Sequence, residues 1–168
     1  TFSIKYFAES KTPKITKVES EVNKLLVGLN NEMSTYIKSS EISRFNDSTA
    51  VNKPFAISPN FQKTLALSLE ISEKTQGLFD PTIGPLVNLW GFGPDGVRKV
   101  PTKDEISKAT LKVGYKNLSL ENNGISKKIP GLYLDLSASA KGYGVDLIAG
   151  YLESLSVKNY MVEIGGEV

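Results

Sequence analysis

The sequence of 168 residues contains neither cysteine nor histidine. Without cysteine there are no disulfides, thiolate nucleophiles or cysteine-based zinc sites, and without histidine the commonest general base and nitrogen ligand is missing. Any metal ion bound by these side chains must therefore be held by oxygen. Magnesium and calcium prefer such ligands, whereas zinc and copper favour nitrogen and sulfur.

Long apolar runs are also missing, since none approaches the roughly 18 residues of a membrane-spanning helix, and no signal-peptide pattern is present. The 20 Lys and Arg residues are balanced by 18 Asp and Glu residues, and the net charge of +2 is spread along the chain. A nucleic-acid surface would be more basic, so nucleic acid is not an expected partner. With 40% apolar residues, the chain can bury one independent core.

Hydrophobic periodicity predicts helices mixed with short strands. Ser58 before a proline, and Thr102 followed by Glu105, are signals for helix N-termini. The Asn-Gly pair at residues 123–124 predicts a hairpin. We expect helices near residues 16–31, 59–77, 104–111 and 137–155, a short helix capped by Ser40, and strands near residues 1–7, 55–57, 132–136 and 160–164. Because helices and strands do not alternate regularly, the predicted class is α+β, a mixed sheet with packed helices.

The segment from Asp135 to Gly144 joins a predicted strand to a predicted helix. A helix start offers free N–H groups and a positive dipole end, and Lys141 adds charge there, so a pyrophosphate is a suitable ligand. Asp135 could accept hydrogen bonds from a ribityl or ring group, and turn carbonyls could bind magnesium. Alternatively, Ser137 caps the helix and the small residues allow close packing. Neither the Rossmann nor the P-loop motif is present.

Residues 77–94 are rich in Gly and Pro and lack periodicity, which predicts a long structured loop. Phe79, Trp90 and Phe92 offer flat faces that suit a planar ring, with Asp80 beside them. The alternative is that these aromatic side chains simply belong to the core. Tyr36, which follows the first predicted helix, is a further candidate for ligand contact, with ordinary half-burial as its alternative.

Taken in order, these clusters resemble the FAD:protein FMN transferase family, also called ApbE or flavin-trafficking proteins. The motifs that carry the resemblance are M-S-T-Y at residues 33–36, S-E-I-S-R-F-N at 40–46, F-D-P-T-I-G-P-L-V-N-L-W-G-F-G-P at 79–94, V-G-Y at 113–115, D-L-S-A-S-A-K-G-Y at 135–143 and V-E-I-G-G-E at 162–167. The resemblance implies an α+β fold related to T-fold-like architectures, with FAD held between substructures and Mg²⁺ on its pyrophosphate.

The activity that the resemblance implies is Mg²⁺-dependent transfer of FMN from FAD to a Thr or Ser hydroxyl of an acceptor protein, with release of AMP. The expected acceptors are redox-pump subunits. Such phosphoryl transfer can depend on positioning and charge neutralisation, without a His or Cys nucleophile. The alternatives are an Mg²⁺-dependent FAD pyrophosphatase, a non-catalytic FAD-binding module, and a structural domain whose aromatic loop is core.

Site residues follow from the same resemblance, position by position. The predicted FAD contacts are Tyr36, Leu78, Phe79, Asp80, Asp135 and Lys141. Ala138 is expected to offer its backbone carbonyl to magnesium. Some members of the family carry an acidic residue where Lys141 stands, so this position departs in part from the family pattern.

The resemblance covers residues 1–168 as the N-terminal portion of the family's domain. The C-terminal part, which supplies carboxylate and hydroxyl ligands to magnesium after the G-G-E segment, is expected to be absent from this chain. Because the strand pattern starts at Thr1, we expect a natural segment before it. Many members are lipid-anchored periplasmic proteins of bacteria, so the expected location is the periplasm, as an inner-membrane lipoprotein that meets the membrane only through its anchor.

Overall fold

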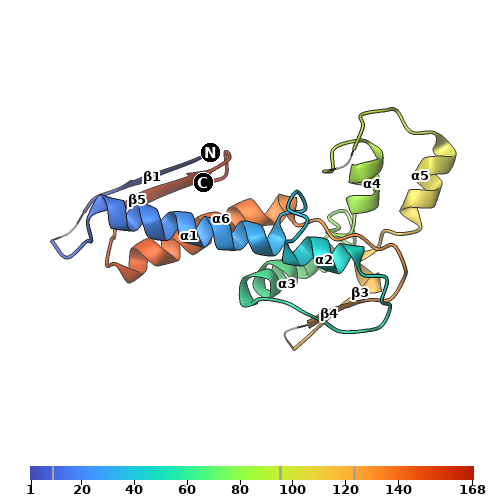
Figure 1. The fold of residues 1–168 in the computed structure, drawn as a ribbon, viewed down its shortest axis with the longest axis horizontal. Helices are drawn as coiled ribbons and strands as arrows, with labels where there is room; N and C mark the ends of the chain where they lie inside the picture. Colours follow the sequence, from blue (N-terminus) through green and yellow to red (C-terminus); the bar gives the residue numbers. More distant parts are fainter. Residues whose placement is uncertain (9, 95, 123) are drawn as a thin grey trace. The chain divides into compact units, whose positions relative to one another are not determined.

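The computed structural model describes residues 1–8, 10–94, 96–122 and 124–168, which form two compact units (Figure 1). The first unit comprises Thr1–Asn30 and Ser137–Val168, and the second comprises Asn31–Leu136. Helices accompany two small antiparallel sheets in the described residues, which confirms the α+β prediction. The strands form two separate sheets. Among the described residues, parallel pairing occurs at an isolated bridge between Ile83 and Tyr133.

In the first unit two strands pair beside two long helices. Strand β1 (Phe2–Tyr6) runs antiparallel to β5 (Tyr160–Ile164), so the first and last strands of the chain lie side by side (Figure 1). The helices are α1 (Ile15–Met33) and α6 (Ser137–Ser154). Their bounds confirm the helices predicted near residues 16–31 and 137–155.

The core of the first unit forms where these helices cover the strand pair. Its fully buried side chains include Val22, Ile148 and Leu152. Burial of each such side chain contributes about 1.5–3 kcal/mol relative to exposure. No helix of the described segments combines the length and the apolar character that crossing a membrane requires.

The second unit contains short helices and a three-stranded sheet of order β2-β4-β3. Its elements are α2 (Glu41–Asp47), β2 (Phe55–Ala56), α3 (Pro59–Lys74), α4 (Gly84–Leu89), α5 (Lys103–Thr110), a 3₁₀ turn (Tyr115–Asn117), β3 (Leu118–Glu121) and β4 (Gly124–Lys127). The predicted hairpin corresponds to β3 and β4, although Asn123 in its turn lies outside the described residues.

The predicted helix caps of this unit are confirmed. Ser40 Oγ accepts the N–H of Ser43 at 3.2 Å, and Ser58 Oγ accepts the N–H of Phe61 at 3.4 Å. Each serine satisfies a donor that the first helical turn leaves unpaired. The serine caps therefore fix where α2 and α3 begin.

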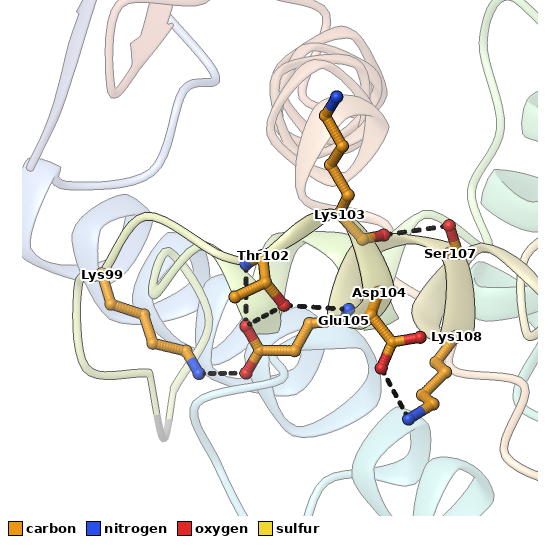
Figure 2. A network of polar contacts seen from close by, with 7 residues as sticks. All are labelled: Lys99, Thr102, Lys103, Asp104, Glu105, Ser107 and Lys108. Carbon is orange, nitrogen blue, oxygen red and sulfur yellow. Dashed lines mark hydrogen bonds and ion pairs between the residues drawn. The ribbon is translucent and has the colours of Figure 1, made fainter.

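The capping box of α5 is extended by a lysine (Figure 2). Thr102 N–H donates to Glu105 Oε2 at 2.8 Å, and Glu105 N–H donates to Thr102 Oγ1 at 3.3 Å. Lys99 Nζ lies 2.6 Å from Glu105 Oε1. The hydrogen bond from Lys99, followed by those from Thr102, lowers the pKa of Glu105 from 4.5 to about 2.

Glu105→Gln is expected to remove the part of the folding stability that depends on the ionised Glu105 carboxylate. Because the folded-state pKa of Glu105 lies below its unfolded value, the stabilisation is complete above pH 4.5 and disappears as the pH falls toward about 2. The melting temperatures of wild type and variant should therefore differ at pH 7 and converge in that window. A difference that stays constant from pH 7 to pH 2 would show that the ionised carboxylate contributes nothing.

The structure differs from prediction in two segments. The pattern of residues 132–136 predicts a strand, but of these residues only Tyr133 forms a β-bridge. The N–H of Leu134 instead donates to the side chain of Asn46, and the N–H of Asp135 donates to the carbonyl of Pro81. Residues 84–89, predicted as part of a loop, form α4 beside α5 (Figure 1). Pro85 in the first turn of α4 is compatible with a helix start.

Candidate functional site

The loop that carries Leu78 begins at the end of α3. Gln76 (φ 54°) and Gly77 (φ 86°) both adopt left-handed backbone conformations, which are common where helices end. The chain then turns away from the helix and leaves the Leu78 side chain 94% exposed. Phe79 is half-buried, and its N–H donates to Thr75 Oγ1 at 3.2 Å. The helix end therefore presents an apolar side chain to solvent.

Asp80 lies at the centre of a hydrogen-bond network. Its Oδ1 accepts the N–H of Thr82 at 2.8 Å and the hydroxyl of Thr82 at 2.6 Å. Its Oδ2 accepts the N–H of Tyr115 at 2.9 Å. An ionised carboxylate offers roughly four acceptor positions, so the described donors occupy three of them. By this count, one acceptor position on Oδ2 has no donor among the described residues.

Tyr115 connects this network to α3. Its hydroxyl donates to Glu73 Oε2 at 2.9 Å, and this hydrogen bond is the largest cause of the raised pKa of Tyr115. Its ring also lies against the start of the loop, because a Cβ added to Gly77 would lie 3.5 Å from Tyr115 Cε1. Tyr115, the first residue of the 3₁₀ turn, therefore contacts both Asp80 in the loop and Glu73 in α3.

The predicted contact Asp135 lies beside this loop. Its N–H donates to the carbonyl of Pro81 at 2.8 Å. The preceding residue, Leu134, exchanges two hydrogen bonds with the side chain of Asn46: Leu134 N–H donates to Oδ1 at 2.8 Å, and Nδ2 donates to the Leu134 carbonyl at 2.9 Å. The structure thus brings Asp135 beside Pro81, although the two residues are separated by more than 50 residues in the sequence.

Asn46 is itself held by a buried cation. Lys127, which is 1% exposed, donates from Nζ to the Asn46 carbonyl at 3.2 Å. The ammonium lies 4.8 Å from the ring centroid of Phe45, a favourable cation–π arrangement. Burial lowers the pKa of Lys127, opposed by the negative charge of Asp47. The C-terminal end of α2, where Asn46 lies, is therefore anchored on strand β4.

Tyr36 and the aromatic loop meet elsewhere in the second unit. The Tyr36 hydroxyl donates to the Phe92 carbonyl at 3.0 Å, and the Tyr36 side chain is 66% exposed. Phe92 is 58% exposed, with the Arg98 guanidinium 5.1 Å from its ring centroid. Because Trp90 also remains 39% exposed, these rings do not simply fill a core. These side chains therefore remain partly accessible to a ligand.

Ala138 and Lys141 belong to the first unit, in the first turns of α6, and both are exposed. Lys141 Nζ lies 3.1 Å from Glu167 Oε1, so the K-G-Y and G-G-E motifs meet. Gly165 and Gly166, with φ of 58° and 94°, form the turn that returns Glu167 toward α6. Such an exposed ion pair contributes about 0–1 kcal/mol, so a phosphate could replace Glu167 at small cost.

The residues present do not complete a metal site. Across the described ranges, no three acidic side chains gather where they could hold an ion. Ala138, the predicted metal contact, could offer one carbonyl oxygen, whereas magnesium takes about six oxygens.

Sequence reasoning did not single out Asn46, Thr82 or Gly114 as contributors to the site. Each acts through hydrogen bonds to a segment far along the chain, and such partners leave no local periodicity. The available signal was their place inside the S-E-I-S-R-F-N, F-D-P-T-I-G-P and V-G-Y motifs.

Gly84→Ala is expected to destabilise the protein by about 1–3 kcal/mol through overpacking. A Cβ at Gly84 would lie 2.3 Å from Tyr133 Cδ1 and 3.0 Å from the Tyr133 carbonyl oxygen. Gly150→Ala is the matched control, because nothing lies within 4 Å and alanine favours helix α6 by about 0.5–1 kcal/mol. Urea denaturation should give changes of opposite sign, and equal changes would contradict the packing argument.

Comparison with known proteins agrees with this fold. A curated "FAD:protein FMN transferase" of Vibrio cholerae serotype O1 is 44% identical over 169 residues, covering 100% of this chain and 50% of that protein. The corresponding protein of Haemophilus influenzae is 44% identical over 174 residues, again covering 100% of this chain and 50% of that protein. The chain thus spans about half the length of the curated relatives that it matches.

Solved structures lead to the same family. The flavin transferase ApbE from Vibrio cholerae superposes with a TM-score of 0.95 at 44% identity, covering 98% of this chain and 53% of that one. The apo form of the Pseudomonas stutzeri flavinyl transferase ApbE gives 0.93 at 34% identity, covering 98% and 55%. The ApbE family model matches residues 1–168. From the fold, the motifs and these matches, we conclude that the chain belongs to the ApbE family.

Proposed function

We propose that this chain provides the FAD-binding part of an enzyme that transfers FMN from FAD to a Thr or Ser hydroxyl of an acceptor protein and releases AMP. Support comes from relatives named FAD:protein FMN transferase that match the whole chain at 44% identity. The observation that carries the proposal is the hydrogen bond of Asp135 N–H to Pro81, at 2.8 Å. It joins two of the segments of the second unit that are predicted to contact FAD, the loop with Leu78, Phe79 and Asp80 and the segment with Asp135.

Leu78, Asp80 and Asp135 are proposed to contact the flavin of FAD. Leu78 is an exposed apolar side chain that suits an isoalloxazine ring, and the exposed Tyr36, which lies elsewhere in this unit, is proposed as a separate FAD contact. Asp80 keeps an acceptor position on Oδ2, and the Asp135 carboxylate can accept hydrogen bonds from ring or ribityl donors. These groups would orient the flavin and exclude water from one side of it.

Lys141 is proposed to contact FAD through its phosphate groups. The ammonium group of Lys141 pairs, among the described residues, with the exposed Glu167, and such an exposed pair is weak. In the proposed reaction the acceptor hydroxyl oxygen bonds to the FMN phosphorus, the bond from that phosphorus to the AMP oxygen breaks, and the hydroxyl proton is released. Magnesium, proposed from the family resemblance, would neutralise phosphate charge when bound. Ala138 is the described residue proposed to contact it.

The acceptor and the location are also proposed from the family resemblance alone. We propose a redox-pump subunit as the acceptor. We propose the periplasm as the location, with a lipid anchor as the route to the inner membrane. Fractionation of the native organism, with immunodetection of the protein, tests the location directly.

The activity is tested with full-length protein, FAD, Mg²⁺ and an acceptor peptide that carries a Thr. Mass spectrometry should show an FMN mass increase on the peptide together with free AMP, and no increase on the same peptide with alanine in place of the Thr. FMN and AMP without a peptide adduct would instead indicate a pyrophosphatase. FAD binding without AMP would indicate a binding module and contradict the proposed transfer.

A further inference from the structure

We infer that Thr82 is a positioning residue for flavin binding. Its buried hydroxyl fixes the Asp80 carboxylate and with it the exposed loop that carries Leu78. The inference rests on the proposed function, because it concerns the same flavin site. It adds a residue that does not itself touch the ligand.

The hydrogen bonds of Thr82 have a fixed direction. A carboxylate only accepts, so the hydroxyl proton of Thr82 must point to Asp80 Oδ1, 2.6 Å away. The oxygen of the same hydroxyl is then free to accept the N–H of Gly114 at 2.7 Å. Thr82 therefore acts as both donor and acceptor between two segments that lie 32 residues apart.

The partner segment is equally constrained. Gly114 has φ of 143°, a conformation that side chains rarely adopt, and an added Cβ would lie 2.9 Å from Asn117 Nδ2. Its N–H points at Thr82, and the next N–H, of Tyr115, points at Asp80 Oδ2. Both carboxylate oxygens of Asp80 are thus oriented by this pair of segments.

Burial excludes a direct role for Thr82 in ligand contact. Its side chain is 0% exposed, whereas Leu78, four residues before it, is 94% exposed. Without the hydroxyl, Gly114 N–H loses its partner and Asp80 Oδ1 keeps only the backbone N–H of Thr82. The Asp80 carboxylate would then rotate more freely. Its Oδ2 atom would no longer keep one orientation toward a ligand.

The test uses full-length protein with three variants, titrated with FAD and followed by flavin fluorescence. Thr82→Val removes the hydroxyl at nearly constant volume and should weaken FAD binding by about tenfold or more. Thr82→Ser retains the hydroxyl and should restore the affinity to within about twofold of wild type. Thr64→Val is the matched control: Thr64 is also 0% exposed, but its hydroxyl donates to Asn60 within α3, so FAD affinity should not change.

Thermal melting of each variant separates loss of folding from loss of binding. If Thr82→Val does not fold, hydrogen exchange of the wild type supplies the test: FAD should slow exchange at the amides of Gly114 and Tyr115, which lie behind the loop. Equal FAD affinity in Thr82→Val and wild type, or exchange at these amides that FAD does not alter, would overturn the inference. Wild-type protein that does not bind FAD would instead overturn the proposed function.

Discussion

Asn46→Ala is expected to lower the free energy of unfolding by about 2–6 kcal/mol, the largest change in stability that we predict. The substitution removes both hydrogen bonds to Leu134, at 2.8 Å and 2.9 Å. Leu134 is completely buried, so water cannot readily replace the lost partner. An unpaired buried N–H or C=O costs about 1–3 kcal/mol, and both would be left.

Asn23→Ala is the control for Asn46→Ala. Asn23 also donates from its side chain to a backbone carbonyl, that of Glu19 at 2.9 Å, but it is exposed on α1. Its replacement should change stability by no more than about 0.5 kcal/mol. Urea denaturation measures both variants. If Asn46→Ala loses no more stability than Asn23→Ala, the two hydrogen bonds between Asn46 and Leu134 do not stabilise the fold as proposed.

Asp80→Asn is expected to weaken FAD binding to full-length protein by about tenfold to a hundredfold, corresponding to the roughly 1.5–3 kcal/mol of a hydrogen bond to a charged group. The amide that replaces the carboxylate has one acceptor and one donor. In either orientation its NH₂ group faces an N–H, that of Thr82 or that of Tyr115. The network around the loop therefore cannot form completely.

Asp104→Asn is the control for Asp80→Asn, because it makes the same change of carboxylate to amide outside the proposed flavin site. Asp104 is exposed on α5, and its Oδ2 lies 2.7 Å from Lys108 Nζ. Figure 2 shows this ion pair. Its replacement should leave FAD affinity unchanged. Isothermal titration of FAD into both variants, with a melting curve for each, makes the comparison. Equal affinities in Asp80→Asn and Asp104→Asn would exclude Asp80 from flavin binding.

Much of the fold was predictable from local sequence. Ser40, Ser58 and the Thr102–Glu105 pair all lie at the helix starts that their capping chemistry predicts. Helix α1 was predictable because one apolar face repeats with helical period along it, and α6 because apolar residues recur along it at helical spacing. These signals are local, so they require no knowledge of distant partners.

The remaining features depend on partners far along the chain. Residues 132–136 alternate like a strand, but their backbone groups pair with Asn46 and Pro81 instead of a neighbouring strand. Helix α4 was hidden by the Gly and Pro residues around it. For the site, motif order supplied the candidates Asp80 and Asp135, whereas the link between them through Pro81 became visible only in the structure.

The central claim is that this chain contributes a flavin site built on the loop 78–82 and the segment around Asp135. Hydrogen exchange of full-length protein with and without saturating FAD tests it most directly. FAD should slow exchange at the amides of Phe79, Thr82 and Asp135. Unchanged exchange at all three amides, under conditions where FAD binding is saturated, would contradict the account.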